Sequence, residues 1–335
     1  MSTTATSVGP STVIDDEERE DLSNDGNKWK ELVGRLNRQS VDKHFDAYAD
    51  VAWDAPEMQI DPHDPRWELS EADPLGRTEW YRSLPQETRA ELGLLRIAAN
   101  MKVGLQFESI LQRGLLEYAA KLPNNRPEFR YIYHEVIEEG HHSMMFQEFV
   151  NRTGFDVPGM PPLITVAARR VILMGRRFPE MFFVFVLGGE DPIDHVQRES
   201  LRSGRDLHPL LERIMRIHVT EEARHLSFAR HYLKGKVPRL GRIKRFAVSI
   251  QAPITLGIMA GLMLRPPRHL VKRYGIPRAV LAEAYGSPEA KAEVRRSLRK
   301  VRQLCVELGL VTRVSRPIWK AFGIWDEETN DTPSR

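Results

Sequence analysis

Cysteine is almost absent from this sequence, since Cys305 is the only one in 335 residues. A single thiol excludes an intrachain disulfide framework, and it excludes zinc-finger and iron–sulfur sites, which need several thiolates. A large excess of charge of one sign is also missing, because the formal net charge is only +3. The composition therefore does not indicate a protein that binds nucleic acid. No signal peptide is visible, and with one cysteine this predicts a cytoplasmic protein.

No convincing β-strand pattern is present, whereas apolar residues at helical spacing recur in long stretches between glycines and prolines. We predict helices from about Ser83 to Pro123, 127–152, 164–177, 179–202, from an N-cap at Asp206 to Gly235, and 288–308. Ser83 and Gln86 have the spacing of a capping box at the first of these starts. Long helices with short connections predict an all-α fold, a helical bundle.

The ends of the chain differ in composition from its middle. Residues 1–26 are rich in Ser, Thr, Asp, Glu and Gly and contain no apolar run, which predicts a disordered N-terminal tail. We expect one domain over 27–325, with its metal-binding helices at about 83–235, followed by a C-terminal tail over 326–335.

The most apolar segment, 246–264, is flanked by basic residues on both sides. A helix of that length only just spans a bilayer. Gln251 and Pro253 lie inside it, and a bundle of this size needs one helix that is buried on all sides. We therefore favour a buried core helix. The alternative is a shallow, peripheral contact with a membrane.

The motif Glu-x-x-His occurs twice, at Glu139/His142 and at Glu222/His225. Residues three apart on a helix point the same way, so each pair can hold one metal ion from a single turn. Both pairs fall on helix faces that are otherwise mostly apolar. Because an ionised carboxylate in an apolar core costs several kcal/mol without a compensating cation, these pairs indicate metal binding.

Two further glutamates complete the pattern of a two-metal site. Glu108 and Glu190 lie on apolar helix faces, and the interval from Glu108 to Glu139 nearly equals the interval from Glu190 to Glu222. Two helical hairpins, each contributing Glu and then Glu-x-x-His, form a pseudo-twofold arrangement around two metals. Four carboxylates balance the charge of two ferrous ions, and this mixture of carboxylate and imidazole suits iron or manganese. We expect a ferritin-like bundle with a four-helix metal-binding core and extra flanking helices.

His218 lies one turn before Glu222 and adds a third histidine to the site. With it, the sequence resembles the p-aminobenzoate N-oxygenase family of diiron oxygenases over roughly residues 85–265. The resemblance implies that the metal ligands are Glu108, Glu139, His142, Glu190, His218, Glu222 and His225. It also implies that two iron ions activate O2 through a peroxo-diferric intermediate, and that the known arylamine members oxidise an amine nitrogen.

Glutamates also directly precede the two motif glutamates, at Glu138 and Glu221. A ligating imidazole usually donates its second N–H to a carboxylate, so Glu138, Glu221 and Asp194 are candidates to orient the histidines. A solvent-exposed charge is the alternative for each. Glu138 lies on a more polar helix face than Glu139 does.

We expect a non-haem diiron oxygenase that oxidises a small organic substrate, with N-oxygenation of an arylamine as the reaction implied by the resemblance. A hydroxylase or desaturase acting on an apolar, lipid-like substrate is the alternative. A ferroxidase or iron-binding ferritin relative is a candidate of a different class. The expected partners are O2 and an external electron donor such as a ferredoxin or a reductase, and we expect a homodimer. The sequence does not separate an iron–iron pair from an iron–manganese pair.

Overall fold

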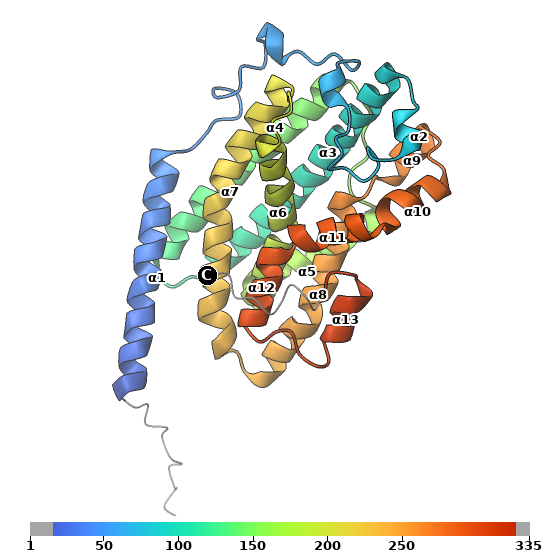
Figure 1. Cartoon of the computed structure of the whole chain (residues 1–335). Coiled ribbons are helices and arrows are strands. Elements are labelled where there is room, and N and C mark those ends of the chain that lie inside the picture. The colour runs from blue at the N-terminus through green and yellow to red at the C-terminus, as the bar shows by residue number, and fades with distance from the viewer. Residues whose placement is uncertain (1–15, 326–335) are drawn as a thin grey trace, which may run out of the picture.

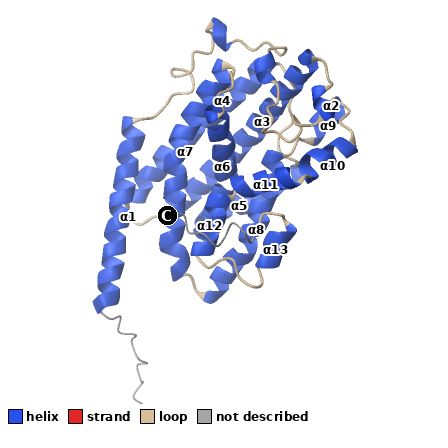
Figure 2. Ribbon diagram, in the orientation of Figure 1, coloured by secondary structure: helices blue, strands red, loops and turns tan. Residues whose placement is uncertain are grey.

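The computed structural model describes residues 16–325, with side chains from residue 26 onward, and this part of the chain contains helices and loops but no strand (Figures 1 and 2). The long helices are α1 (Asp16–Asp42), α3 (Gln86–Ala119), α4 (Pro127–Thr153), α5 (Pro162–Arg177), α6 (Pro179–Arg202), α7 (Pro209–Lys236) and α8 (Arg242–Leu264). The short helices are α2 (Glu79–Arg82), α9 (Arg268–Arg273), α10 (Arg278–Gly286), α11 (Pro288–Ser297), α12 (Arg299–Glu307) and α13 (Arg316–Ala321). Single 3-10 turns are η1 (Pro56–Met58), η2 (Pro65–Trp67) and η3 (Val237–Arg239).

The predicted all-α, ferritin-like fold is confirmed. Its core consists of two helical hairpins, α3 with α4 and α6 with α7, and these four helices carry all the predicted metal ligands. Helices α1, α5 and α8 flank this core, α11 and α12 pack on α6, and α13 packs on α8 (Figure 1). Prolines set several of the boundaries, because Pro127, Pro179 and Pro209 each occupy a first turn, where a missing N–H costs nothing.

Two predicted helix starts are wrong in detail. Ser83 ends helix α2 instead of capping the next helix, so α3 begins at Gln86 without a side-chain cap. His208, rather than Asp206, is the N-cap of α7, and its ring accepts a hydrogen bond from the amide of Leu210. An imidazole nitrogen replaces the carboxylate oxygen that we expected at this position.

Helix α1 begins at Asp16, inside the segment 1–26 for which we predict a disordered tail. That prediction is therefore wrong for residues 16–26. They form the first part of α1, and the later part of this helix packs on the bundle. Leu32 and Leu36 are buried against the core, and the Trp29 indole donates a hydrogen bond of 2.7 Å to Glu128 on α4. The rest of the predicted N-terminal tail and the predicted C-terminal tail, 326–335, lie outside the described residues.

Helix α8 contains the apolar segment 246–264 and is buried on one side only. Val248, Ala252 and Leu256 pack into the core, whereas Phe246 and Ile258 are exposed. The prediction of a helix buried on all sides is therefore wrong, because α8 covers the edge of the bundle instead of filling its centre. By length and composition alone, Arg242–Arg273 is the one stretch of the described chain that is able to cross a membrane, and 44% of its most apolar window is buried.

A polar layer divides the interior into two apolar clusters. One cluster contains the residues of α3 from Phe107 onward together with the C-terminal half of α7, and the other contains α3 up to Met101 together with the N-terminal half of α7. In α7 the predicted metal ligands lie between the two clusters, and in α3 Glu108 lies at the edge of the first cluster, next to Phe107. The bundle thus holds its charged residues in one layer with packed side chains on both sides.

Candidate metal centre

The structure brings all seven predicted ligands into one buried cluster. Each has at most 2% of its surface exposed, and they come from four helices: Glu108 from α3, Glu139 and His142 from α4, Glu190 from α6, and His218, Glu222 and His225 from α7. Ligand atoms that all lie within 4.8 Å of one another form three overlapping groups, Glu108–His142–His218, Glu139–His142–Glu222 and Glu190–His218–Glu222. The cluster has the residue types and the compactness of a two-metal site.

Glu139 and Glu222 occupy the middle of the cluster. His225 Nδ1 lies 2.8 Å from Glu139 Oε1 and 3.1 Å from Glu222 Oε1. His142 Nδ1 lies 2.9 Å from Glu139 Oε2 and 3.7 Å from Glu222 Oε1. Because both carboxylates reach toward both imidazoles, Glu139 and Glu222 would hold bound metal from the centre of the cluster.

His218 lies at one end of the cluster and contacts its carboxylates less closely. Its Nε2 atom is 3.8 Å from Glu108 Oε1, 3.9 Å from Glu222 Oε1 and 4.0 Å from Glu190 Oε2. Three acceptors at these distances around one nitrogen leave space for an ion between them. Glu108 and Glu190 would hold bound metal from this end of the cluster.

The protonation of these groups also fits a site made for cations. Burial, followed by the neighbouring carboxylates, raises the pKa of both Glu108 and Glu190 well above the ordinary value. Burial opposes ionisation of Glu139 too, but the imidazoles of His225 and His142 outweigh it and hold the pKa of Glu139 well below its usual range. Carboxyl groups that repel one another in an apolar interior ionise fully when divalent metal binds and releases their protons.

Unpaired oxygens give the most direct test of whether metal fits. Glu108 Oε2 and Glu222 Oε2 are buried and have no hydrogen-bond partner. A buried polar atom without a partner costs about 1–3 kcal/mol, and more if the group is charged. Two such oxygens in one cluster, each among imidazole nitrogens, fit metal ligation because an ion supplies the missing partner.

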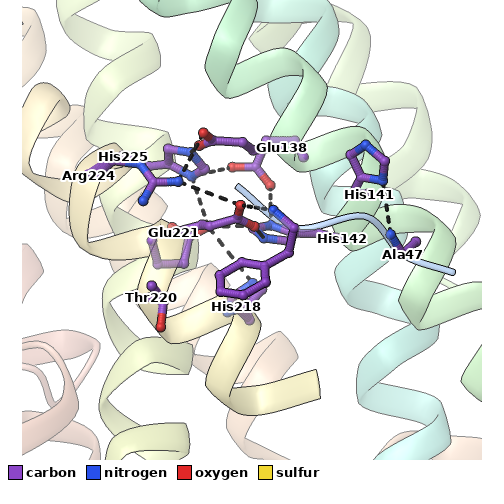
Figure 3. Close-up of polar contacts among 12 residues, drawn as sticks. Ala47, Glu138, His141, His142, His218, Thr220, Glu221, Arg224 and His225 are labelled. Atoms are coloured by element: carbon purple, nitrogen blue, oxygen red, sulfur yellow. Dashed lines mark hydrogen bonds and ion pairs between the residues drawn. The ribbon is translucent and has the colours of Figure 1, made fainter. Parts of the chain in front are cut away.

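Two glutamates outside the cluster bind its histidines in a crossed arrangement (Figure 3). Glu138 of α4 lies 2.6 Å from Nε2 of His225 on α7, and Glu221 of α7 lies 2.9 Å from Nε2 of His142 on α4. Each carboxylate accepts the Nε2–H of its histidine, which leaves Nδ1 to face the metal position. Arg224 lies beside both glutamates, 2.9 Å from Glu138 and 3.5 Å from Glu221.

The face of α4 that carries Glu138 is covered by the N-terminal segment, although its sequence is polar. The amide of Phe45 donates a hydrogen bond of 3.1 Å to Glu221. The amide of Ala47 donates one of 3.1 Å to His141 (Figure 3). Glu138 is consequently only 3% exposed and Glu221 is fully buried. Solvent exposure, the alternative for these two charges, is wrong.

The third predicted orienting residue has a different role. Asp194 accepts a hydrogen bond of 2.7 Å from Arg198, one turn further along α6. Gln197 of the same helix reaches the site, with its Oε1 atom 2.9 Å from Nδ1 of His218. The side chain of α6 that is observed beside a ligand histidine is therefore Gln197, whereas the carboxylate of Asp194 is bonded to Arg198.

Comparison with known proteins identifies the family. The model of the family described as p-aminobenzoate N-oxygenase AurF matches residues 27–309. The chain belongs to the AurF family. Uncharacterized proteins of Mycobacterium tuberculosis and Mycobacterium bovis are each 43% identical to it over 301 residues, which cover 90% of this chain and 88% of each relative. No solved structure matches the chain.

The AurF-family site of this chain contains an eighth buried residue that we did not predict, Glu135. Glu135, Glu139 and His225 form a further group whose ligand atoms lie within 4.8 Å of one another. Burial raises the pKa of Glu135 to about 8, and its Oε2 atom has no hydrogen-bond partner. A signal was present in the sequence, because the interval from Glu135 to His218 is the same as the interval from Glu139 to Glu222.

A cavity of about 1020 Å³ reaches the AurF-family site from one side only. Glu108, Glu190 and His218 line its inner end, whereas Glu135, Glu139, Glu222 and the two crossed histidines do not. Apolar side chains form much of the wall, among them Met101, Phe107, Phe146, Ile193 and Met215. An organic molecule is thus able to approach the predicted metals from the side of His218.

Proposed function

We propose that this protein is an O2-dependent diiron oxygenase. The observation that supports this most strongly is the buried cluster of four carboxylates and three imidazoles, two of whose oxygens have no hydrogen-bond partner, in a chain of the AurF family. Two iron ions bound by these residues would supply the redox chemistry that activates dioxygen.

The protein's own contribution begins with the orientation of its ligands. Glu138 and Glu221 fix the tautomers of His225 and His142, so both rings present an unprotonated Nδ1 to the metals. Glu139 and Glu222 keep the two metal positions together from the centre. The dry interior around these groups strengthens every electrostatic interaction among them, since bulk water does not screen it.

The reaction that we propose places one oxygen atom of O2 on the substrate and releases the other as water. It consumes two electrons and two protons, and an external donor of the ferredoxin or reductase class supplies the electrons. The substrate lies in the cavity next to His218. The apolar wall keeps water away from the reacting atoms, which limits side reactions.

The test measures iron binding and oxygen consumption in the same preparations. The iron-loaded, reduced protein is exposed to O2 with panels of arylamines and of fatty acyl compounds, and products are identified by mass spectrometry with labelled O2. We expect about two irons per chain and one labelled oxygen atom in the product. The matched control, His225→Ala, removes a ligand and is expected to show neither. Iron uptake in large excess with silent oxidation would contradict the proposal and support a ferroxidase instead.

A further inference from the structure

The cavity beside the metal centre is elongated, and helix α3 forms one wall along its length. Both Arg96 and Glu108 line it, and both belong to this one continuous helix. At a rise of about 1.5 Å per residue, the two positions are roughly 18 Å apart. A molecule that uses both ends of the cavity must therefore be much longer than a single aromatic ring.

Between its two ends the wall formed by α3 carries no charge. Met101, Val103 and Gly104 line this middle part, and Phe146 of α4 and Met215 of α7 face it from the neighbouring helices. Such a wall favours an aliphatic or otherwise apolar body, because each methylene moved from water to an apolar site gains about 0.8 kcal/mol.

The far end holds a buried cation whose hydrogen bonds are incomplete. Arg96 is 5% exposed, and its Nη1 atom donates to the backbone oxygen of Arg265 at 2.7 Å and to Asn100 at 3.3 Å. Its Nε atom is buried and has no hydrogen-bond partner. The carboxylate of Asp73 is 3.7 Å from Nε, too far for a hydrogen bond, and it accepts hydrogen bonds from Leu75 and Tyr285 instead.

We propose that the substrate is an elongated amphipathic carboxylic acid. Its carboxylate binds the guanidinium of Arg96, which pairs with Asp73 at 3.7 Å and whose Nε–H makes no hydrogen bond, and its apolar chain extends along α3 to Glu108, Glu190 and His218. The assignment rests on the proposed oxygenase function and names its substrate class. A one-ring arylamine acid is short compared with the roughly 18 Å between these two helix positions, so we place the oxidised atom on a chain, several bonds from the acid group.

Binding is measured without O2, so the result does not depend on catalysis. The iron-loaded protein is titrated calorimetrically with straight-chain carboxylic acids of increasing length and with the primary alcohols of equal length. We expect affinity for the acids to rise with chain length until the cavity is filled, and to exceed that for the alcohols. Arg96→Gln is expected to weaken acid binding roughly tenfold to a hundredfold while alcohol binding stays unchanged.

The matched control for this variant is Arg113→Gln, an exposed arginine of the same helix that bonds to its own turn and does not line the cavity. We expect it to bind both series like the wild type. Equal weakening of acids and alcohols in Arg96→Gln, or no weakening, would overturn the assignment, as would tighter binding of arylamines than of every acid. Thermal unfolding of each variant identifies any that fails to fold.

A second variant tests the path of the chain. A Cβ atom at Gly104 would lie 3.3 Å from the ring of Phe146, so Gly104→Val narrows the middle of the cavity. In this variant long acids should no longer bind more tightly than short ones. In the control Gly235→Val, at an open position on α7, long acids should still bind more tightly. An unchanged length dependence in Gly104→Val would refute the path. Acids that bind as expected but yield no oxygenated product would contradict the oxygenase and leave the binding assignment intact.

Discussion

The two sides of the metal layer are built from equivalent positions with different residues. On the open side, His218 lies beside the cavity with Glu108 and Glu190. On the closed side, the equivalent residue is Glu135, and Tyr131, one turn earlier on α4, stacks on Phe228 with the ring centres 4.6 Å apart. The two halves of the bundle thus share the predicted metal ligands and differ in the residue one turn before them. This difference separates the side that the cavity reaches from the side that is packed with aromatic rings.

The largest expected effect is a difference in iron binding between variants of His225, in the centre of the cluster, and of His218, on the open side. His225 lies within 3.1 Å of three carboxylates, whereas no carboxylate comes nearer than 3.8 Å to His218. Changing a residue that only orients a ligand lowers metal affinity roughly 10–100-fold. We expect His225→Ala, which removes a predicted ligand, to lower the affinity for iron by more than that. We expect His218→Ala to retain part of its iron. Iron-to-protein ratios after gel filtration distinguish the two, and equal losses would show that the two sides bind metal alike.

Changing Glu138 or Glu221, the two crossed glutamates, should lower the affinity for iron by a smaller factor. Glu138→Gln and Glu221→Gln keep the shape of each side chain but remove the negative charge that orients His225 or His142. We expect each to weaken iron binding roughly 10–100-fold, as is usual for such partners. Competition with a chelator of known affinity measures this loss. The control is Glu212→Gln on a partly exposed turn of α7, where only Arg216 is lost as a partner; a similar loss there would contradict the specific role of the crossed pairs.

On the closed side, Glu135 should destabilise the iron-free protein. Its Oε2 atom is buried without a partner, which costs about 1–3 kcal/mol, so Glu135→Met should unfold at higher denaturant concentration when iron is removed. Chemical denaturation of both iron-free proteins measures the difference. Loss of iron binding in the variant would show instead that Glu135 is itself a ligand.

The pH dependence of this difference has a definite sign. Burial raises the pKa of Glu135 from an ordinary value of 4.5 to about 8 in the fold. A raised carboxyl pKa costs no stability below pH 4.5, and the cost grows by at most about 1.4 kcal/mol per pH unit as the pH rises toward 8. The advantage of iron-free Glu135→Met should therefore widen over this range. Unfolding curves at several pH values test it, and a constant difference would place the ionisation elsewhere.

The smallest expected effect concerns Tyr131. Its hydroxyl is buried and has no hydrogen-bond partner, and burial raises its pKa far above the usual value. Tyr131→Phe removes only this oxygen, so we expect the iron-free protein to gain up to about 1 kcal/mol in unfolding free energy. Unchanged iron binding and oxygen consumption would agree with a supporting role, whereas a large loss of activity would show that the closed side takes part in the reaction.

Most of the metal cluster follows from the sequence because a helix fixes the direction of every side chain along it. Glu139 and His142 must share a face wherever the helix packs, and the matching intervals from Glu108 and Glu190 indicate two hairpins. The ligand set as such stays a prediction until metal is measured, but the convergence of its members needed no knowledge of the packing.

Contacts between helices were harder to predict. The crossed pairing of Glu138 and Glu221 depends on how α4 and α7 are rotated against each other, which no local pattern encodes. The polar face with Glu138 is buried because the segment with Phe45 and Ala47 packs over it, and no pattern in that segment predicts this contact. The partner of Asp194 was hard to predict for a similar reason, since the choice between Arg198 and a histidine depends on distances across the bundle.

The hydrogen bond from Phe45 to Glu221 joins residues 176 positions apart in the chain. The outer wall of the centre is therefore completed by a contact between an early segment of the polypeptide and one of its later helices. Closing so long a loop is slow compared with forming a helical hairpin. During refolding in the presence of iron, we accordingly expect helix content to recover before iron is bound tightly. Until the contact between Phe45 and Glu221 forms, the centre is open to solvent and bound iron dissociates.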